Sequence, residues 1–163
     1  MKSICFFVPG KPQGKGRPRF ARTSRGVRTY TPADTALYEH HIAQCCKQAA
    51  DGYMFPDDTP LEMRIRATFL VPKSYSRRKR DACLSGLIRP TCKPDMDNIA
   101  KCVADALNGV AYRDDSRIFK LVIVKEYGTE EGLTVTVSEE RKSFEQETVE
   151  GWGERREENA ETD

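Results

Sequence analysis

Two acidic residues separated by one position, Asp95 and Asp97, are the first candidates for chemistry in this chain. In extended backbone, residues two apart point to the same side, so both carboxylates can be directed at one point. Two carboxylates that close repel each other unless a positive charge neutralises them. A hard divalent cation with oxygen ligands does so, and magnesium or manganese suits such a pair better than zinc. The pair therefore predicts a metal site.

Two further residues extend this constellation. Lys101 follows Asp97 by four positions, so on a helix its side chain projects from the same face one turn later. A lysine at that place can stabilise charge that develops on a phosphate, or help to deprotonate and orient an attacking water. Asp115 lies in a turn after the helix, and a fold that returns this turn to the Asp pair would make it a third metal ligand.

Each residue also has a structural interpretation. An Asp at a helix start is most often a cap worth about 1 kcal/mol, and a lone lysine is usually a solvated helix residue. Asp114 and Asp115 alone would be an ordinary turn, and an arginine-rich loop is more often a solvated surface than a DNA clamp. The combination of all these features in one small chain favours the functional interpretation.

Alternating and helical patterns predict the elements that position these residues. Alternation predicts a strand at residues 4–8 and a longer one at residues 61–71, where every second residue is apolar. A capping Thr-Pro pair at 31–32 and an apolar stripe predict a helix up to Gly52. A second helix is expected at residues 97–108, with Gly109 just beyond its end.

Two apolar strands, at residues 118–126 and 133–137, complete the pattern, and the glycine-containing link between them predicts a hairpin. The order β-α-β-α-β-β predicts an α+β fold: a single compact domain in which a mixed β-sheet packs against two main helices. At 163 residues the chain is long enough for one such domain and too short for a second full one.

Charge is distributed unevenly along the chain. Residues 139–163 hold ten acidic and four basic residues, a net of −6, which leaves residues 1–138 at +8. We expect a domain at 1–138 followed at 139–163 by an acidic tail that is mobile or forms a poorly anchored helix. Residues 11–30 and 74–94 are predicted to be irregular basic loops that contact phosphates without reading sequence. The candidate contacts are Lys11, Lys15, Arg17, Arg19, Arg77, Arg78, Lys79, Arg80 and Lys93.

The six cysteines do not follow a zinc-binding spacing, and the start of the chain shows neither an export signal nor an apolar run of the roughly 20 residues that a membrane span needs. We therefore interpret the cysteines as reduced thiols and expect a cytoplasmic protein with no membrane partner.

The run PDMDNIAKCVADALNGVAYRDDSRI resembles the signature of the RusA family of Holliday junction resolvases. In that signature D-x-D-N, a lysine four residues after the second Asp, D-A-L and a D-D pair follow one another in this order. The resemblance extends from about Ile4 to Val137 and includes the basic segment GKPQGKGRPRF. The insertion between residues 71 and 95 is longer than in compact members, and the acidic tail is not part of the signature.

The resemblance implies that Asp95, Asp97 and Asp115 are the metal-binding catalytic carboxylates and that Lys101 is the catalytic lysine. It implies a homodimer that binds branched DNA, above all four-way junctions, and nicks two strands symmetrically with Mg²⁺, for which Mn²⁺ substitutes. The family is frequent in bacteria and their prophages, so we expect a phage role in resolving replication or packaging branches. The resemblance also implies a part in DNA recombination and repair.

Two alternatives remain. A nuclease of the restriction-enzyme type needs an acid-x-Lys on a strand, whereas the lysine here lies on an expected helix. A nucleic-acid-binding module without catalysis would use the basic loops alone, but the retention of all four candidate residues argues against it.

Overall fold

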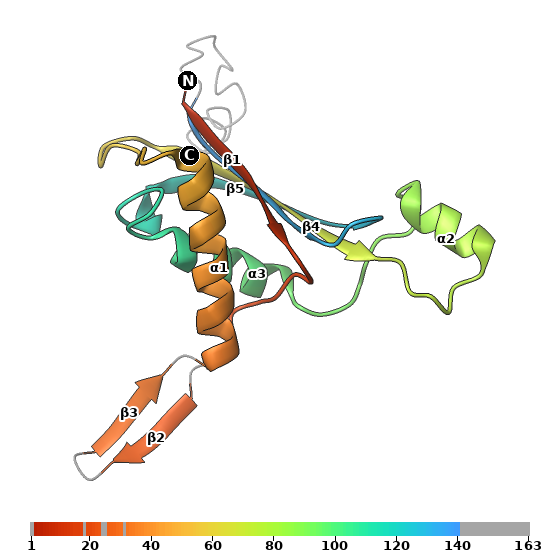
Figure 1. Ribbon diagram of the computed structural model, residues 1–163, viewed down its shortest axis with the longest axis horizontal. Helices are drawn as coiled ribbons and strands as arrows, with labels where there is room; N and C mark the ends of the chain where they lie inside the picture. The colour runs from red at the N-terminus through yellow and green to blue at the C-terminus, as the bar shows by residue number, and fades with distance from the viewer. Residues whose placement is uncertain (1, 18, 24–25, 31, 141–163) are drawn as a thin grey trace, which may run out of the picture.

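The strand β4 (Leu61–Leu70) lies inside a four-stranded mixed sheet of order β1-β6-β4-β5. It pairs antiparallel with β6 (Gly132–Glu139) and parallel with β5 (Ile118–Gly128), and β6 pairs antiparallel with β1 (Ser3–Pro9). The computed structural model describes residues 2–17, 19–23, 26–30 and 32–140, and the backbone alone within 19–30 (Figure 1). The predicted α+β fold with a mixed sheet is confirmed.

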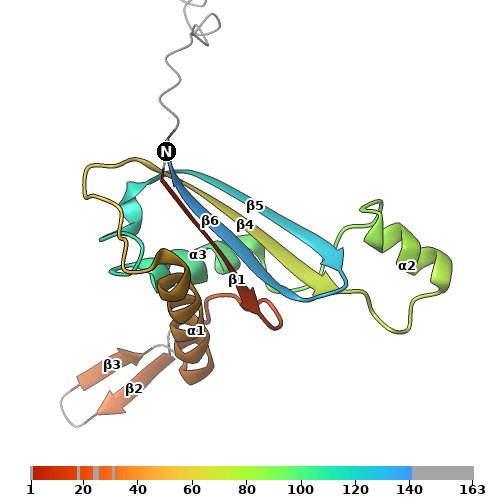
Figure 2. The same ribbon diagram turned by 45° about the horizontal axis from the view of Figure 1, so that its top comes forward.

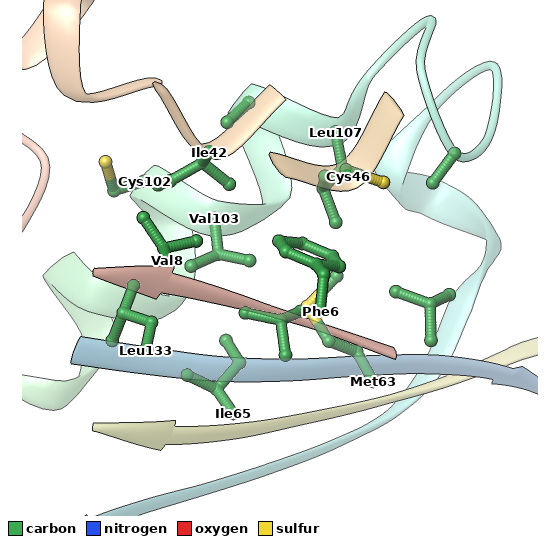
Figure 3. Packing of buried hydrophobic residues seen from close by; sticks show 14 of the residues in the cluster. Phe6, Val8, Ile42, Cys46, Met63, Ile65, Cys102, Val103, Leu107 and Leu133 are labelled. Carbon is green, nitrogen blue, oxygen red and sulfur yellow. The ribbon is translucent and has the colours of Figure 1, made fainter. Parts of the chain in front are cut away.

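Two helices cover one face of this sheet, α1 (Ala33–Ala50) and α3 (Met96–Leu107) (Figure 2). The alternation in β4 is the cause: Met63, Ile65 and every second residue along it are buried, whereas the residues between them face outward. Phe6 of β1 and Leu133 of β6 extend the same apolar layer, against which Val103 and Leu107 of α3 pack (Figure 3). Burial of this layer is the main force that fixes α3 on the sheet.

The prediction that the last two strands form a hairpin is wrong. β5 and β6 are consecutive in the chain, yet β4 lies between them and pairs with both. The chain leaves β4, passes through α2 and α3 and returns as β5, which pairs parallel to β4 on the edge that β6 does not occupy. Alternation reveals which face of a strand is buried, but not which edge it offers to which neighbour.

Both segments expected to be irregular basic loops contain regular structure. Residues 11–30 include the hairpin of β2 (Arg19–Thr23) and β3 (Gly26–Tyr30), which projects beyond the end of α1 (Figure 1). Residues 74–94 include α2 (Arg77–Leu84), at the opposite end of the molecule, with the Ser76 side chain accepting a hydrogen bond from the Lys79 amide at 3.4 Å. Arginine, lysine and alanine are good helix formers, so propensity and a serine cap outweigh the lack of an apolar stripe here.

The remaining boundaries agree within one or two residues. α1 begins one residue later than expected, with Pro32 as its N-cap, and Gly109 follows α3 with a positive φ of 70°. Of the predicted tail, Glu139 is the last residue of β6, and residues 141–163 lie outside the described part of the chain. All six cysteines are free thiols. No helix in the described residues is both long and apolar enough to cross a membrane.

The packing of α3 on the sheet is testable at Leu107, whose side chain is completely buried. Leu107→Ala is expected to lower the free energy of unfolding by about 2–5 kcal/mol, because the shortened side chain leaves a cavity. Urea titration followed by circular dichroism measures this loss. Leu37→Ala, at an exposed position on α1, is the control and should change stability by less than about 0.5 kcal/mol.

Candidate active site at the start of helix α3

The two carboxylates of the Asp-x-Asp pair stand free at the start of α3. Asp95 is the N-cap residue, in extended backbone with φ −70° and ψ 151°, and its side chain makes no capping hydrogen bond. Asp97 lies in the first turn of the helix, and both residues are exposed. The structural interpretation of these acids as helix caps therefore does not account for them, and their oxygens remain available to a ligand.

The segment before Asp95 is held by a lysine from the sheet. Lys125 of β5 donates hydrogen bonds from its Nζ to the backbone carbonyl oxygens of Cys92 and, at 3.1 Å, of Pro94. The same Nζ lies 5.4 Å from the centre of the Phe69 ring on β4. A charged donor on two carbonyls is stronger than a neutral one, so this contact fixes the chain just before the Asp pair.

The basic N-terminal segment packs directly against the start of α3. The Lys15 amide donates a hydrogen bond of 2.8 Å to the Asn98 carbonyl oxygen. Gly14 lies so close that an added Cβ would be 2.8 Å from the Asn98 Cβ and 2.9 Å from the Pro94 Cβ. Between these two segments lies an open groove of about 460 Å³, lined by residues 11–15 together with Lys93, Pro94, Asp95 and Asn98.

A chain of ion pairs joins this segment to both helices and to the turn after α3. The Lys15 Nζ contacts a carboxylate oxygen of Glu39 on α1 and, at 2.9 Å, Asp105 Oδ2 on α3. The other oxygen of Asp105 is 2.9 Å from the Lys101 Nζ, which is in turn 3.5 Å from Asp115 Oδ2. Four segments that are distant in sequence therefore meet through five side chains.

The pKa values within this chain reflect the balance of burial and pairing. Burial acts to raise the pKa of Asp105, but hydrogen bonds from Lys101 and Lys15 outweigh it and hold the pKa below its ordinary value. Burial acts to lower the pKa of Lys15, and the hydrogen bonds to Glu39 and Asp105 outweigh it and raise the pKa. The hydrogen bond to Asp105 also raises the pKa of Lys101. Lys101 is therefore a cation whose charge is stabilised at neutral pH.

The two acids of the pair after α3 have different surroundings. Asp114 caps the short 3-10 helix Asp115–Arg117, accepting a hydrogen bond of 2.9 Å from the Ser116 amide. Asp115 instead faces Lys101. Asp114 is thus used by the local fold, whereas Asp115 turns toward the residues of α3.

The described residues include no group of three His, Cys, Asp or Glu side chains that could hold a metal ion. The structure brings Asp115 to Lys101 and places Asp95 in the lysine-lined groove, but it does not unite Asp95, Asp97 and Asp115 as one three-ligand group.

Comparison with known proteins extends this description. The sequence profile of the family described as "Endodeoxyribonuclease RusA" matches residues 9–138, which include the groove and the whole ion-pair chain. The chain belongs to the RusA family. Members of this family are nucleases that resolve Holliday junctions and depend in general on a divalent metal ion. The chain is also 34% identical over 141 residues to "Uncharacterized protein YqaN" of Bacillus subtilis (strain 168), covering 85% of this chain and 98% of that protein.

The basic residues expected to contact DNA in this RusA-family chain fall into three groups. The ammonium of Lys15 is engaged between Glu39 and Asp105. The side chain of Arg19 lies outside the described residues. The others are exposed, on the N-terminal segment, on α2 and before the Asp pair: Lys11, Arg17, Arg77, Arg78, Lys79, Arg80 and Lys93.

The sequence analysis did not predict three residues of the site: Glu39, Asp105 and Lys125. Asp105 had a local signal, because it follows Lys101 by four positions on the same helix face. Glu39 and Lys125 had none, since each reaches the site only through contacts distant in sequence.

The role of Lys125 in holding the site is testable by hydrogen exchange. Lys125→Met removes both hydrogen bonds to the 92–94 carbonyls, so exchange in the peptide covering residues 92–98 should accelerate by roughly fivefold to tenfold. Mass spectrometry of exchanged, protease-digested protein measures this. Lys120→Met, also on β5 but without a contact to this segment, should leave the rate unchanged. Equal rates in wild type and Lys125→Met would show that the contact does not hold the segment.

A second prediction concerns the ion-pair chain. Lys15→Met removes one of the two cations that hold the pKa of Asp105 low, so this pKa should rise. Carbon NMR of the Asp105 carboxyl during a pH titration measures the change. A carboxyl group whose pKa is lower in the folded than in the unfolded protein stabilises the fold at pH values above its unfolded pKa. The contribution of Asp105 is therefore present at neutral pH and is lost as the pH falls through the folded pKa. Lys11→Met, in the same segment but unpaired with Asp105, should leave the Asp105 titration unchanged.

Proposed function

We propose that this RusA-family chain is a structure-specific endodeoxyribonuclease that, as a homodimer, nicks two strands of a four-way DNA junction symmetrically with Mg²⁺, for which Mn²⁺ substitutes. The observation that carries the proposal is the groove in which Asp95 faces the basic N-terminal segment. Lysines attract a phosphodiester. The carboxylates of Asp95 and Asp97, which make no helix-capping hydrogen bond, repel it unless a cation lies between them and the phosphate. This combination is expected of a metal-dependent phosphodiesterase.

The donor set fits a hard cation. Asp95 and Asp97 offer carboxylate oxygens, both are exposed, and neither oxygen pair is consumed by a helix cap. We assign the ion to these two residues, with Asp115 as the third ligand. When bound, such an ion lowers the pKa of coordinated water and polarises the phosphodiester.

The lysines have separate roles in this proposal. Lys101, a cation stabilised by Asp105, offsets the charge that develops on the phosphate in the transition state. Lys11 and Lys93 line the groove next to Asp95 and hold the phosphate that is cut. Lys15 acts through Asp105 and through the Asn98 carbonyl, and so positions the site.

DNA beyond the cut phosphate contacts the exposed basic side chains of α2. Arg77, Arg78, Lys79 and Arg80 are consecutive and exposed, and no acidic residue lies in the first turn of this helix. The Lys79 Nζ stands 3.6 Å from the centre of the Tyr75 ring, which holds that side chain on the helix. α2 and the hairpin of β2 and β3 extend from the body in different directions, so the arms of a branched molecule can engage both (Figure 1).

One observation favours a second function, a nucleic-acid-binding module without catalysis. No three-ligand metal group occurs within residues 2–17, 19–23, 26–30 and 32–140. Such a module would bind junctions through the same lysines and arginines and would not cut.

Cleavage of a synthetic mobile four-way junction, beside a linear duplex, separates the two functions. With Mg²⁺ or Mn²⁺ we expect paired symmetric nicks in the junction alone, with 5′-phosphate and 3′-hydroxyl ends, and none with EDTA. Denaturing gels with each strand labelled in turn locate the nicks. Tight binding without cutting under either metal would identify the binding module instead.

Variants of the acids control this assay. Asp95→Asn should reduce nicking to background yet leave junction affinity equal or higher, because a carboxylate that repels phosphate is gone. Asp114→Asn is the matched control and should cut normally, since asparagine can still accept the hydrogen bond of the Ser116 amide. Loss of affinity and folding together in Asp95→Asn would contradict its catalytic role.

A further inference from the structure

The strand β5 has one edge without a partner among the described residues. It is bonded to β4 on one side, and it has no other strand neighbour in the described part of the sheet. The backbone amides and carbonyls of that outer edge are therefore open to another strand where α2 does not pack against β5. Most edge strands avoid association through charges, prolines or a covering segment.

The side chains of β5 increase this exposure instead of limiting it. On the helix-covered face, Leu121 is 46% exposed, whereas Met63, its partner on β4, is 0% exposed. On the opposite face, Val122 and Val124 are exposed next to Arg64 and Arg66. Phe119 is exposed as well, at the register shift between β4 and β5. Apolar residues on both faces are typical of a strand inside a sheet, and β5 is at its edge.

We propose that this edge is where two copies of the chain associate, by antiparallel pairing of β5 with β5 of the second copy around a twofold axis at Ile123. The proposal deepens the homodimeric nuclease proposed above and rests on it for the number of copies. An axis perpendicular to the sheet keeps each face continuous, so each residue meets one that faces the same way. The two sheets then form one eight-stranded sheet.

Charge complementarity selects this register. With Ile123 on the axis, Lys120 of each copy is opposite Glu126 of the other, and Val122 is opposite Val124. Both charged side chains lie on the face away from the helices, where opposite charges directly across two strands stabilise the pair.

Neighbouring registers lack this match. An axis at Val122 sets Lys120 against Val124 and Ile118 against Glu126, and an axis at Val124 sets Val122 against Glu126. Neither of these registers sets Lys120 against Glu126, so both residues lose their oppositely charged partner across the axis. The register at Ile123 pairs them with each other and leaves Lys125 opposite an apolar side chain, Leu121.

This pairing places the two active sites where paired nicking needs them. Because the axis is perpendicular to the sheet, both copies carry α1 and α3 on the same side of the joined sheet. Leu121 of each copy lies opposite Lys125 of the other, and Lys125 holds the segment that leads to Asp95. Both Asp pairs therefore face one side of the dimer, close to its axis, toward a single junction.

Charge reversal on the full-length chain tests the register. Sedimentation equilibrium of the wild type should give about twice the chain mass of 18.5 kDa. Lys120→Glu alone and Glu126→Lys alone each create two like-charged pairs, so each should raise the dimer dissociation constant by roughly tenfold. An equimolar mixture of the two variants should recover wild-type affinity as a heterodimer, because both of its cross-strand pairs are again opposite in charge.

The mixture separates intermolecular from intramolecular effects. Within its own chain Lys120 contacts Glu62 at 3.4 Å and Glu126 contacts Arg66 at 3.7 Å, and any damage from losing these contacts would persist in the mixture. Lys47→Glu, an exposed charge reversal on α1, is the matched control and should leave the dimer unchanged. Circular dichroism verifies that each variant is folded.

Three outcomes overturn the proposal. A mixture that associates no better than the single variants would exclude this register. A dimer unaffected by either reversal would place the interface elsewhere. A monomeric wild type would exclude self-association. Any protection of the β5 amides from exchange would then come from another segment of the same chain. Junction cleavage measured on the same preparations shows separately whether the nuclease assignment holds.

Discussion

The bridge that Asp105 makes between Lys15 and Lys101 is the constraint on which the site depends. A half-buried carboxylate is costly unless cations and hydrogen bonds satisfy it, and here it has one lysine on each oxygen. One of these lysines belongs to the N-terminal segment, and the other is the catalytic candidate of α3. The segment cannot move away without leaving Asp105 half paired, so the geometry of the basic groove and the position of Lys101 are coupled.

The Asp pair has a second set of restraints from the opposite direction. Lys125 fixes the carbonyls before Asp95 from the sheet side, while Gly14 and the Lys15 amide pack on Asn98 just after Asp97. Only backbone and small groups make the second contact, because a Cβ on Gly14 would overlap Asn98 and Pro94. The carboxylates themselves make neither contact. The surrounding chain is thus held firmly, while the carboxylates of Asp95 and Asp97 stay unoccupied by protein donors.

How much of this was readable from the sequence differs from element to element. The alternation of β4 and the apolar arc of α3 placed both elements within one or two residues, because each depends on burial of one face. The partner of each strand edge was not readable, which is why β4 between β5 and β6 was missed. At the site, the spacing of Asp95, Asp97 and Lys101 was informative since it is local to one helix start. Asp105 was not among the predicted site residues, although its position four residues after Lys101 on the same helix is a local signal for their pairing. The contacts of Lys15 with Glu39 and of Lys125 with the 92–94 carbonyls depend on tertiary structure, so no local sequence pattern predicts them.

The twofold symmetry of a four-way junction links the edge strand β5 to the active site. A four-way junction presents two equivalent strands related by a twofold axis, so a nuclease that cuts both at once needs two sites related in the same way and facing the same side. A dimer whose two copies carried their helices on opposite sides of the joined sheet would have its two active sites facing in opposite directions. Edge-to-edge pairing about an axis perpendicular to the sheet keeps them together, and β5 is the strand that both offers an open edge and carries the lysine bound to the segment before Asp95. In the proposed dimer the same strand therefore sets the distance between the sites and the position of each one.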